Sequence, residues 1–322
     1  MKPIGGFFEL LLPRQSVAYH EGAVALSNGR ACIRTMLRSL DIKKCYVPNY
    51  TCDAVYCPFE LEGVDYELYS IDEHLNPVSV PTLAEGEFFY YINYFGVKNG
   101  TVNKLYDTYG DRLLIDNTHD FFKKRQHDCW SFTSARKYFG VPDGAFLYGK
   151  PGNNVGVDAP RFKDYSLAHC VDRLKGDQDK SLQEFREYEA SLNSEIYRIS
   201  RLSEKMLSSV DVEEVSQKRK DNFQTLHARL REKNRFILDD MSEDDVPFAY
   251  PFLPEGDFDK TALYTSNIFI PTLWADPLAR EGTTDFERRL ATTLMPLPVD
   301  HRYGEEEMGF MAEQVLKELD NG

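Results

Sequence analysis

Residues 113–120 read LLIDNTHD, an apolar run that ends in a carboxylate, and this stretch decides the fold class. The apolar part has the composition of a strand buried on both faces, which is typical of parallel sheets. In open α/β sheets, ligands bind at the carboxyl ends of the strands, and Asp116 lies at that end. Taken alone, Asp116 could also serve only to cap a turn, because aspartate is common in turns.

Strand and helix patterns alternate around this stretch. Helical patterns cover about 30–40 and begin again at about 52–55, and strand-like runs lie at 44–48, 66–69, 88–92, 113–115 and 145–148. Strands that alternate with helices predict an α/β fold, with a mostly parallel mixed sheet flanked by helices.

The rest of the chain divides into regions of different character. Residues 1–165 form the predicted large domain, and 166–240 are charged, proline-free and apolar at helical spacing, which predicts two or more long helices. Residues 241–322 are expected to form a smaller C-terminal α+β domain, with a strand at 267–271 and a last helix at about 304–319.

Composition excludes several classes of protein. The 322 residues include 38 Lys and Arg against 52 Asp and Glu, so the net charge of -14 disfavours nucleic acid or an anionic membrane as partners. No apolar run approaches the roughly 20 residues that span a bilayer, and residues 1–6 lack a signal-peptide pattern. The six cysteines fit reduced thiols, and Cys52 and Cys57 have no partners at zinc-finger spacing. We therefore expect a cytoplasmic protein without a metal site.

A lysine follows the next strand-like run, in SFTSARKYFGVPDGA at residues 131–145. Pyridoxal 5'-phosphate (PLP) chemistry needs a lysine amine that forms a Schiff base and a carboxylate that keeps the pyridine nitrogen protonated. Lys137 and Asp116 fit these two roles. The alternative that Ser134 and Lys137 form the S-x-x-K element of penicillin-binding enzymes lacks the companion S-D-N and K-T-G elements.

The cofactor's phosphate needs hydroxyl donors and the free N–H groups of a helix start. The segment SNGRA at 27–31 opens the first long helix and fits this need. Ser131 or Ser134 would add a hydroxyl. The predicted phosphate-binding residues of the helix start are Asn28, Gly29, Arg30 and Ala31.

In these motifs the chain resembles the DegT/DnrJ/EryC1/StrS family of sugar aminotransferases, which have the PLP-dependent transferase fold type I. The resemblance covers nearly the whole length. It rests on IGGFFEL at 4–10, SNGRA at 27–31, VPNYT at 47–51, YINYFG at 91–96, IDNTH at 115–119 and LPVDHRY at 297–303.

The resemblance implies a function and roles for particular residues. Asp116 would pair with the pyridinium nitrogen, and His119 would lie near the phenolic oxygen of PLP. Lys137 would carry the cofactor and move a proton in a ping-pong transamination from an amino acid donor to a nucleotide-linked keto sugar. A homodimer is also implied.

Three departures from the family pattern leave roles open. The family serine lies five residues before the lysine, whereas Ser131 lies six before Lys137 and Ser134 three before, and the spacing favours Ser134. Cys52 replaces a frequent aromatic residue. The candidates that would stack on the cofactor instead are Tyr50, Tyr94 and His119, and Asn193 is a candidate for the asparagine that reaches across the family's dimer interface.

Two further functions remain open. Some relatives are PLP-dependent sugar dehydratases, but these typically have histidine where this chain has Lys137. A protein of the same fold can also bind cofactor or sugar without turnover, as a partner subunit, because fold does not determine function.

Overall fold

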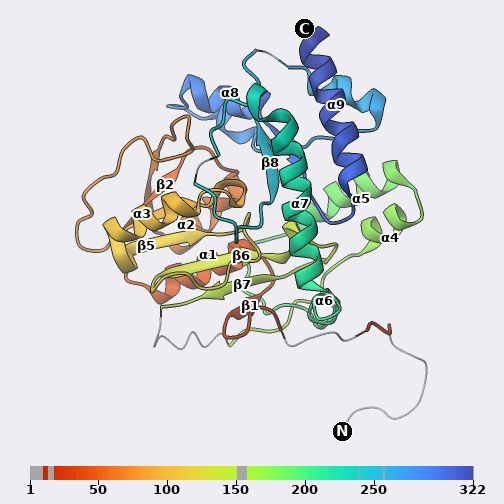
Figure 1. Ribbon diagram of the computed structural model, residues 1–322. Helices are drawn as coiled ribbons and strands as arrows, with labels where there is room; N and C mark the ends of the chain where they lie inside the picture. Colours follow the sequence, from red (N-terminus) through yellow and green to blue (C-terminus); the bar gives the residue numbers. More distant parts are fainter. Residues whose placement is uncertain (1–9, 14–17, 151–157, 239, 257, 322) are drawn as a thin grey trace, which may run out of the picture.

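A computed structural model of the protein describes residues 10–13, 18–150, 158–238, 240–256 and 258–321. The motif at 4–10 lies outside the described residues except for Leu10. Within the described part, a seven-stranded sheet occupies the first half of the chain and a two-stranded sheet lies in the C-terminal part (Figure 1). The strands are β1 Val24–Leu26, β2 Lys44–Pro48, β3 Asp65–Tyr69, β4 Glu87–Ile92, β5 Leu113–Asp116, β6 Trp130–Ser134, β7 Ala145–Tyr148, β8 Ala249–Phe252 and β9 Met295–Pro298.

Helices join and cover these strands. The α-helices are α1 Gly29–Ser39, α2 Cys57–Glu62, α3 Asn99–Tyr109, α4 Ala168–Leu174, α5 Gln178–Ser191, α6 Arg201–Leu207, α7 Val212–Leu230, α8 Asp285–Thr293 and α9 Glu305–Asn321. Short 3₁₀ helices are η1 Asp53–Val55, η2 Tyr94–Gly96, η3 Gly110–Arg112, η4 Ala135–Lys137, η5 Arg231–Lys233, η6 Lys260–Ser266 and η7 Asp276–Ala279. None of the helices in the described part is long and apolar enough to cross a membrane.

The large sheet is mostly parallel, as predicted. Its strand order is β1-β7-β6-β5-β4-β2-β3. The strands from β3 to β6 pair in parallel, and β7 is antiparallel to both of its neighbours. Strands β5 and β6 are buried along their whole length, and the apolar run that begins β5 is typical of a strand that is covered on both faces. The predicted α/β fold class is confirmed.

Helices cover both faces of this sheet. On one face α2 places Phe59 edge-on to Tyr90 of β4, with ring centroids 6.2 Å apart. On the other face Phe89, the preceding residue of β4, stacks on Tyr109 of α3 at 4.8 Å. Neighbouring residues of a strand point to opposite faces, so α2 and α3 lie on opposite sides of the sheet.

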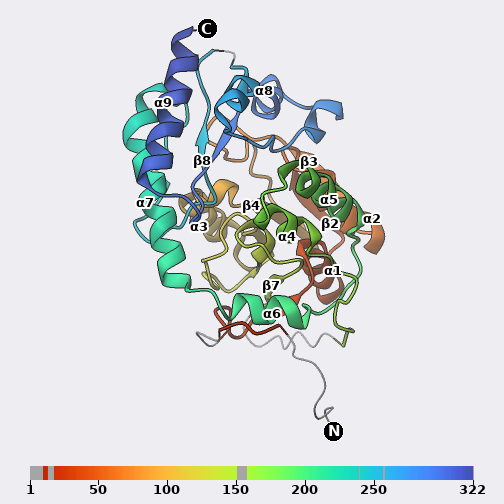
Figure 2. The same cartoon turned by 90° about the vertical axis from the view of Figure 1, so that its right-hand side faces the viewer.

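The C-terminal part forms a smaller layer at one end of the large sheet. Helices α7 and α9 lie side by side there, next to the antiparallel pair β8 and β9 (Figures 1 and 2). The predicted last helix is confirmed as α9. The predicted strand at 267–271 is wrong: the segment follows η6 as irregular chain, because Asn267 has a left-handed φ of 57° and β8 pairs with β9 instead.

The middle region contains α4 to α7, of which α5 and α7 are the long helices that the periodicity predicts. Between α5 and α6 the chain returns to the large sheet. Tyr197 accepts a hydrogen bond from the N–H of Ser27 at 2.9 Å, and Ile199 donates to the carbonyl of Ala25 at 3.1 Å. The helix predicted at 52–55 is the single turn η1. The domain boundaries near 165 and 240 stay predictions.

Candidate active site

Four turns meet at the carboxyl edge of the large sheet. The parallel strands β2, β4, β5 and β6 end at Pro48, Ile92, Asp116 and Ser134, and each is followed by a turn. Strands in parallel register deliver their last residues to the same edge. The turns at 49–53, 93–96, 117–120 and 135–137 therefore carry most of the predicted site residues to one place.

Asp116 is a buried carboxylate held by the protein itself. Its Oδ2 accepts a hydrogen bond from the hydroxyl of Tyr90 at 2.6 Å, and its Oδ1 accepts one from the N–H of Thr118 at 2.8 Å. Burial raises the pKa of Asp116, and these two hydrogen bonds and the charge of Lys137 act in the opposite direction. The carboxylate is fixed in position and lacks a directly bonded cation.

His119 is fully buried between two aromatic rings. Its ring stacks on Phe248 at 4.5 Å and on Trp274 at 5.5 Å, and its Nδ1 accepts a hydrogen bond from the N–H of Phe95 at 3.3 Å. Burial and then the charge of Lys137 lower the pKa of His119 well below its ordinary value. The ring is therefore neutral, and because Nδ1 accepts, its proton lies on Nε2. This Nε2 has no partner among the described residues.

A glycine makes the close contact behind His119 possible. Gly96 has a φ of 71°, and a Cβ atom at this position would lie 2.3 Å from the carbonyl oxygen of His119. The preceding residue, Phe95, also has a left-handed φ of 57°. In this conformation the N–H of Phe95 donates a hydrogen bond to Nδ1 of His119, and the carbonyl of Phe95 accepts one from the N–H of Phe248 at 2.8 Å. Only glycine at 96 fits this arrangement.

A second buried carboxyl group, that of Asp120, binds the turn that contains Phe95 and Gly96. Asp120 accepts hydrogen bonds from the amide groups of Asn93 at 3.2 Å and Asn99 at 3.1 Å. Burial raises the pKa of Asp120 to about 7; Lys123 and the two amides act in the opposite direction, and Asp245 raises it further. Asp120 therefore fastens the 93–99 turn to the loop that carries His119.

Lys137 ends η4, and its side chain is exposed. Its charge lowers the pKa of Asp116, of His119 and of the half-buried Cys52 thiol, whose pKa is raised mainly by burial. The ammonium group of Lys137 is therefore near enough to these three groups for its charge to affect each of them. The structure thus brings the predicted lysine, carboxylate and histidine together, although no direct bond joins the lysine to either partner in the described residues.

The start of α1 borders this group. Asn28 caps the helix, with its side-chain oxygen accepting from the N–H of Ala31 at 2.9 Å. A Cβ atom on Gly29 would lie 3.2 Å from the ring of Phe132 in β6 and 3.7 Å from the methyl group of Thr118. The hydroxyl of Ser27 is buried and has no partner among the described residues. The helix start therefore packs directly on the end of β6, with a free donor beside it.

Strand alternation distinguishes the two candidate serines. Phe132 faces α1, so Ser134, two residues later, points to the same face, and Ser131 points to the opposite one. The Ser134 hydroxyl makes only a long contact of 3.5 Å with the carbonyl of Gly144. Ser134 is thus on the side of the sheet where the helix start lies, which agrees with the preference from spacing.

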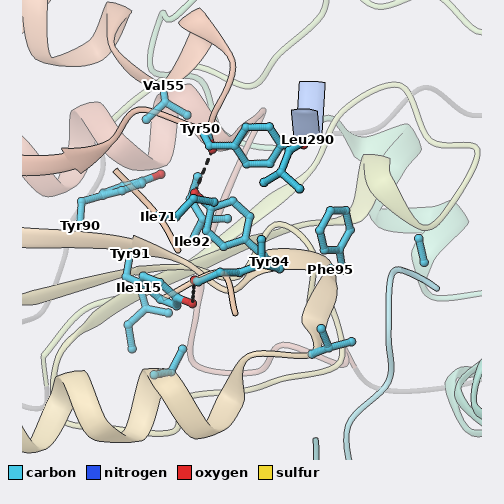
Figure 3. Packing of buried hydrophobic residues seen from close by; sticks show 14 of the residues in the cluster. Tyr50, Val55, Ile71, Tyr90, Tyr91, Ile92, Tyr94, Phe95, Ile115 and Leu290 are labelled. Carbon is cyan, nitrogen blue, oxygen red and sulfur yellow. Dashed lines mark hydrogen bonds between the residues drawn. The ribbon is translucent and has the colours of Figure 1, made fainter. Parts of the chain in front are cut away.

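The predicted stacking residues are already packed against the protein. Tyr50 and Tyr94 are fully buried and face each other, with the Tyr94 hydroxyl donating to the carbonyl of Tyr50 at 2.9 Å (Figure 3). The Tyr50 hydroxyl donates to the carbonyl of Leu273. Both faces of the His119 ring are covered by Phe248 and Trp274. Cys52, the next residue but one after Tyr50, is half-buried.

A segment of the C-terminal part closes the site and was missed in the sequence. Besides Trp274, the segment supplies Asp276, whose Oδ1 accepts from the N–H of Asp53 at 3.2 Å. It also supplies Arg280, which donates to the carbonyl of Thr51 at 2.8 Å and to the hydroxyl of Tyr56 at 2.9 Å. A tryptophan, one of only two in the chain, was the available signal.

Asn193 lies beside the helix start of its own chain. Its carbonyl accepts from the side-chain amide of Asn28 at 3.1 Å, and its side-chain oxygen accepts from the N–H of Glu195 at 3.0 Å. The role predicted for it across a dimer interface stays a prediction. Among the described residues, no group of three or more His, Cys, Asp or Glu could hold a metal ion.

The residues of this edge fit PLP. The free Nε2–H of His119 is a donor for an anionic oxygen, the buried carboxylate of Asp116 suits a protonated ring nitrogen, and the Ser27 hydroxyl and the start of α1 suit a phosphate. Thr51 adds another buried hydroxyl without a partner in the described residues. Lys137 is the one of these groups that is exposed and able to reach an aldehyde.

The comparisons with known proteins agree on the fold. No family model matches the sequence, and no curated protein matches it. Solved structures do match along nearly the whole chain. They include the aminotransferase TlmJ from Streptoalloteichus hindustanus, with 14% identity over 93% of this chain and 86% of that one and a TM-score of 0.65.

Two further matches are named as sugar or family aminotransferases. The sugar aminotransferase CalS13 from Micromonospora echinospora is 13% identical over 91% of this chain and 86% of that one, with a TM-score of 0.62. A DegT/DnrJ/EryC1/StrS aminotransferase from Brucella abortus is 14% identical over 93% of this chain and 86% of that one, with a TM-score of 0.60. The chain therefore has the fold of these enzymes, as the sequence motifs predicted.

Proposed function

We propose that this protein is a PLP-dependent aminotransferase that transfers an amino group from an amino acid to a nucleotide-linked keto sugar. The observation that carries the proposal is the convergence of Lys137, Asp116 and His119 at the carboxyl edge of the sheet, beside the start of α1. The fold, which is that of several named aminotransferases, supports it. The sugar nucleotide and the amino acid donor are parts of the proposal that rest on the family resemblance.

Each residue has a physical task in this proposal. When bound, PLP supplies an electron sink that stabilises negative charge on the substrate carbon. Asp116 holds a proton on the ring nitrogen, because its buried carboxylate gains from a nearby positive charge. His119 has an unpaired Nε2–H, which would donate to the phenolic oxygen of the bound cofactor. Lys137 is the point of covalent attachment and, once free, the base that moves the substrate proton.

The phosphate of PLP would be bound by the start of α1 and by the hydroxyl of Ser134. The backbone N–H groups at the helix start belong to Asn28, Gly29, Arg30 and Ala31. We include a homodimer and a cytoplasmic location in the proposal. All six cysteines of the chain are free, which supports a reducing compartment.

The test is the covalent attachment itself. The protein is saturated with PLP, reduced with borohydride and denatured, and its mass is measured. The natural protein should gain one reduced cofactor, and the Lys137→Ala variant should gain none. The control is Lys317→Ala, which removes an exposed lysine of α9 and should leave the mass gain unchanged.

Attachment alone does not establish transamination. An amino donor added to the natural holoprotein should bleach its visible absorbance, and a nucleotide-linked keto sugar should restore it. A protein that retains PLP on another lysine contradicts the assignment of Lys137. A protein that attaches PLP but is never bleached by any amino donor is a binding protein of this fold.

A further inference from the structure

Arg219 of α7 is a fully buried cation that the fold holds without a carboxylate. It is 1% exposed, and no aspartate or glutamate of the described residues forms an ion pair with it. Its Nη1 donates to the carbonyls of Pro247 at 3.2 Å and Phe248 at 3.1 Å, just before β8, which lies beside α7 (Figure 1). A buried charge is costly unless other groups satisfy it, so its partners are held firmly.

The face of the guanidinium group lies against an aromatic ring that is next to the reactive lysine. The carbon atom Cζ of Arg219 is 4.4 Å from the centre of the Tyr138 ring, a cation–π contact, which is stronger where water is excluded. Tyr138 directly follows Lys137, and its N–H donates to the carbonyl of Ala135 at 3.0 Å. Arg219 therefore holds the η4 turn by the residue next to Lys137.

The two carbonyls that Arg219 binds lead to His119. Phe248 stacks on the His119 ring, with centroids 4.5 Å apart and planes 9° apart. The N–H of Phe248 donates to the carbonyl of Phe95 at 2.8 Å, and the N–H of Phe95 donates to Nδ1 of His119 at 3.3 Å. These contacts fix the plane of the imidazole ring and hence the direction of its unpaired Nε2–H.

An arginine suits this position because one planar group makes both kinds of contact. A guanidinium group donates hydrogen bonds in its plane while its face lies on an aromatic ring. Lysine has its charge at a single nitrogen and has no planar face. Methionine would fill much of the volume but would leave the carbonyls of Pro247 and Phe248 without this donor, which is costly in a buried place.

We propose that Arg219 is a positioning residue of the candidate active site, which fixes the His119 ring and the turn that carries Lys137 relative to each other. Its side chain is covered by protein, so it acts through Phe248 and Tyr138 and not by contact with a ligand. The rings of Phe248 and Tyr138 also meet, with centroids 5.8 Å apart. The proposal rests on the proposed function for the reaction that this geometry serves.

The first measurement uses the protein without a ligand. Histidine is labelled with 15N, the nitrogen signals of the His119 ring are recorded by NMR, and the His119→Gln variant identifies them. Arg219→Met should shift or broaden these signals, because the ring of Phe248 and the hydrogen bond from Phe95 both move. Arg219→Lys keeps the charge and should cause a smaller change.

The matched control is on the same helix. Asn222 is 2% exposed, and its side-chain amide donates to the carbonyls of Val299, Asp300 and Tyr303 at 3.0–3.4 Å. Asn222→Leu therefore also removes buried hydrogen bonds and should lower the temperature of unfolding. It should leave the His119 signals unchanged, which separates a loss of position from a loss of stability alone.

The second measurement uses the PLP-loaded protein and depends on the proposed function. A hydrogen bond from His119 to the phenolic oxygen would weaken the hold of the Schiff base on its proton. Without it, the visible absorbance of Arg219→Met should persist to a proton concentration about three to ten times lower, as expected for one hydrogen bond. The value of kcat should fall about 10- to 100-fold, and KM should change less than about threefold.

The inference is overturned if Arg219→Met and Asn222→Leu lower the stability alike and both leave the His119 signals as in the natural protein. If Arg219→Met does not fold, Arg219→Lys takes its place, and unchanged His119 signals in that variant also overturn the inference. A protein that never binds PLP contradicts the proposed function, whereas the signals of the unliganded protein still decide whether Arg219 positions His119.

Discussion

The two ends of the candidate site are built in opposite ways. At the β5 end, Asp116 and His119 are at most 4% exposed and are held by Tyr90, Thr118 and Phe95. At the η4 end, Lys137 is exposed, and its side chain makes no hydrogen bond within the described residues. The groups whose position must be exact are thus fixed before any ligand binds, and the group that must move is left free.

The difference also appears in the electrostatics. Burial raises the pKa of Asp116 and lowers that of His119, so the β5 end favours neutral groups unless a counter-charge arrives. The η4 end carries the positive charges of Lys137 and Arg136, and Arg136 forms an ion pair with Glu189. A ligand with a cationic ring at one end and anionic groups at the other would satisfy both ends.

The largest effect should come from removing the fixed carboxylate. Asp116→Ala should lower kcat/KM at least about 1,000-fold, because a preorganised charge next to the reacting system is lost. The matched control is Asp111→Ala. Asp111 lies just before the other end of β5 and forms an exposed ion pair with Lys150. Equal losses of activity in the two variants would show that the β5 end has no special role.

The next effect tests the support behind His119 through its pH dependence. The folded protein holds the Asp120 proton up to about pH 7, against an ordinary pKa of 3.8. The stabilisation from this proton is complete below about pH 4 and is lost as the pH rises through about 7. Asp120→Asn does not ionise, so the variant should gain up to about 4 kcal/mol over the natural protein between pH 4 and 8.

Urea unfolding at several pH values measures this change in relative stability. The exposed Asp111→Asn is the control for exchanging an aspartate for an asparagine at the surface. If the difference in unfolding free energy between Asp120→Asn and the natural protein did not change with pH, Asp120 would be ionised throughout. The β5 end would then be less isolated from water than its burial indicates.

The smallest effect concerns the close contact of η2. Gly96→Ala should destabilise the protein by about 3 kcal/mol, from backbone strain plus the collision with the His119 carbonyl. Gly63→Ala shares the positive φ, in the left-handed helical region, but meets no atom within 4 Å, so it should cost only about 1 kcal/mol. Thermal unfolding measures both. Equal costs would show that the turn can move away from His119.

Local sequence determined much of the large sheet and of the β5 end. Apolar runs located the strands, and the carboxylate that follows a buried strand was placed by the general geometry of α/β sheets. Alternation placed Ser131 and Ser134 on opposite faces of β6, but the sequence could not show which face meets the helix start, because both faces are buried. The contact of Phe132 with Gly29 identified that face.

The residues that close the site were not predictable in this way. Trp274 and Arg280 reach His119 and Thr51 across more than 150 positions, and no short-range pattern encodes such contacts. The run at 267–271 has the apolar composition of a strand, but in the structure it pairs with no strand of the described residues, and β8 pairs with β9.

The return of residues 193–200 to β1 limits how the protein can be divided. This segment bonds the N–H of Ser27 and the amide of Asn28, and Ser200 and Ser203 bind the buried carboxylate of Asp143. A fragment that stops at residue 165 would expose each of these groups. Its first helix and the turn that carries Lys137 would lose their outer support, so the half that forms the large sheet is not an independent module but requires the chain that follows it.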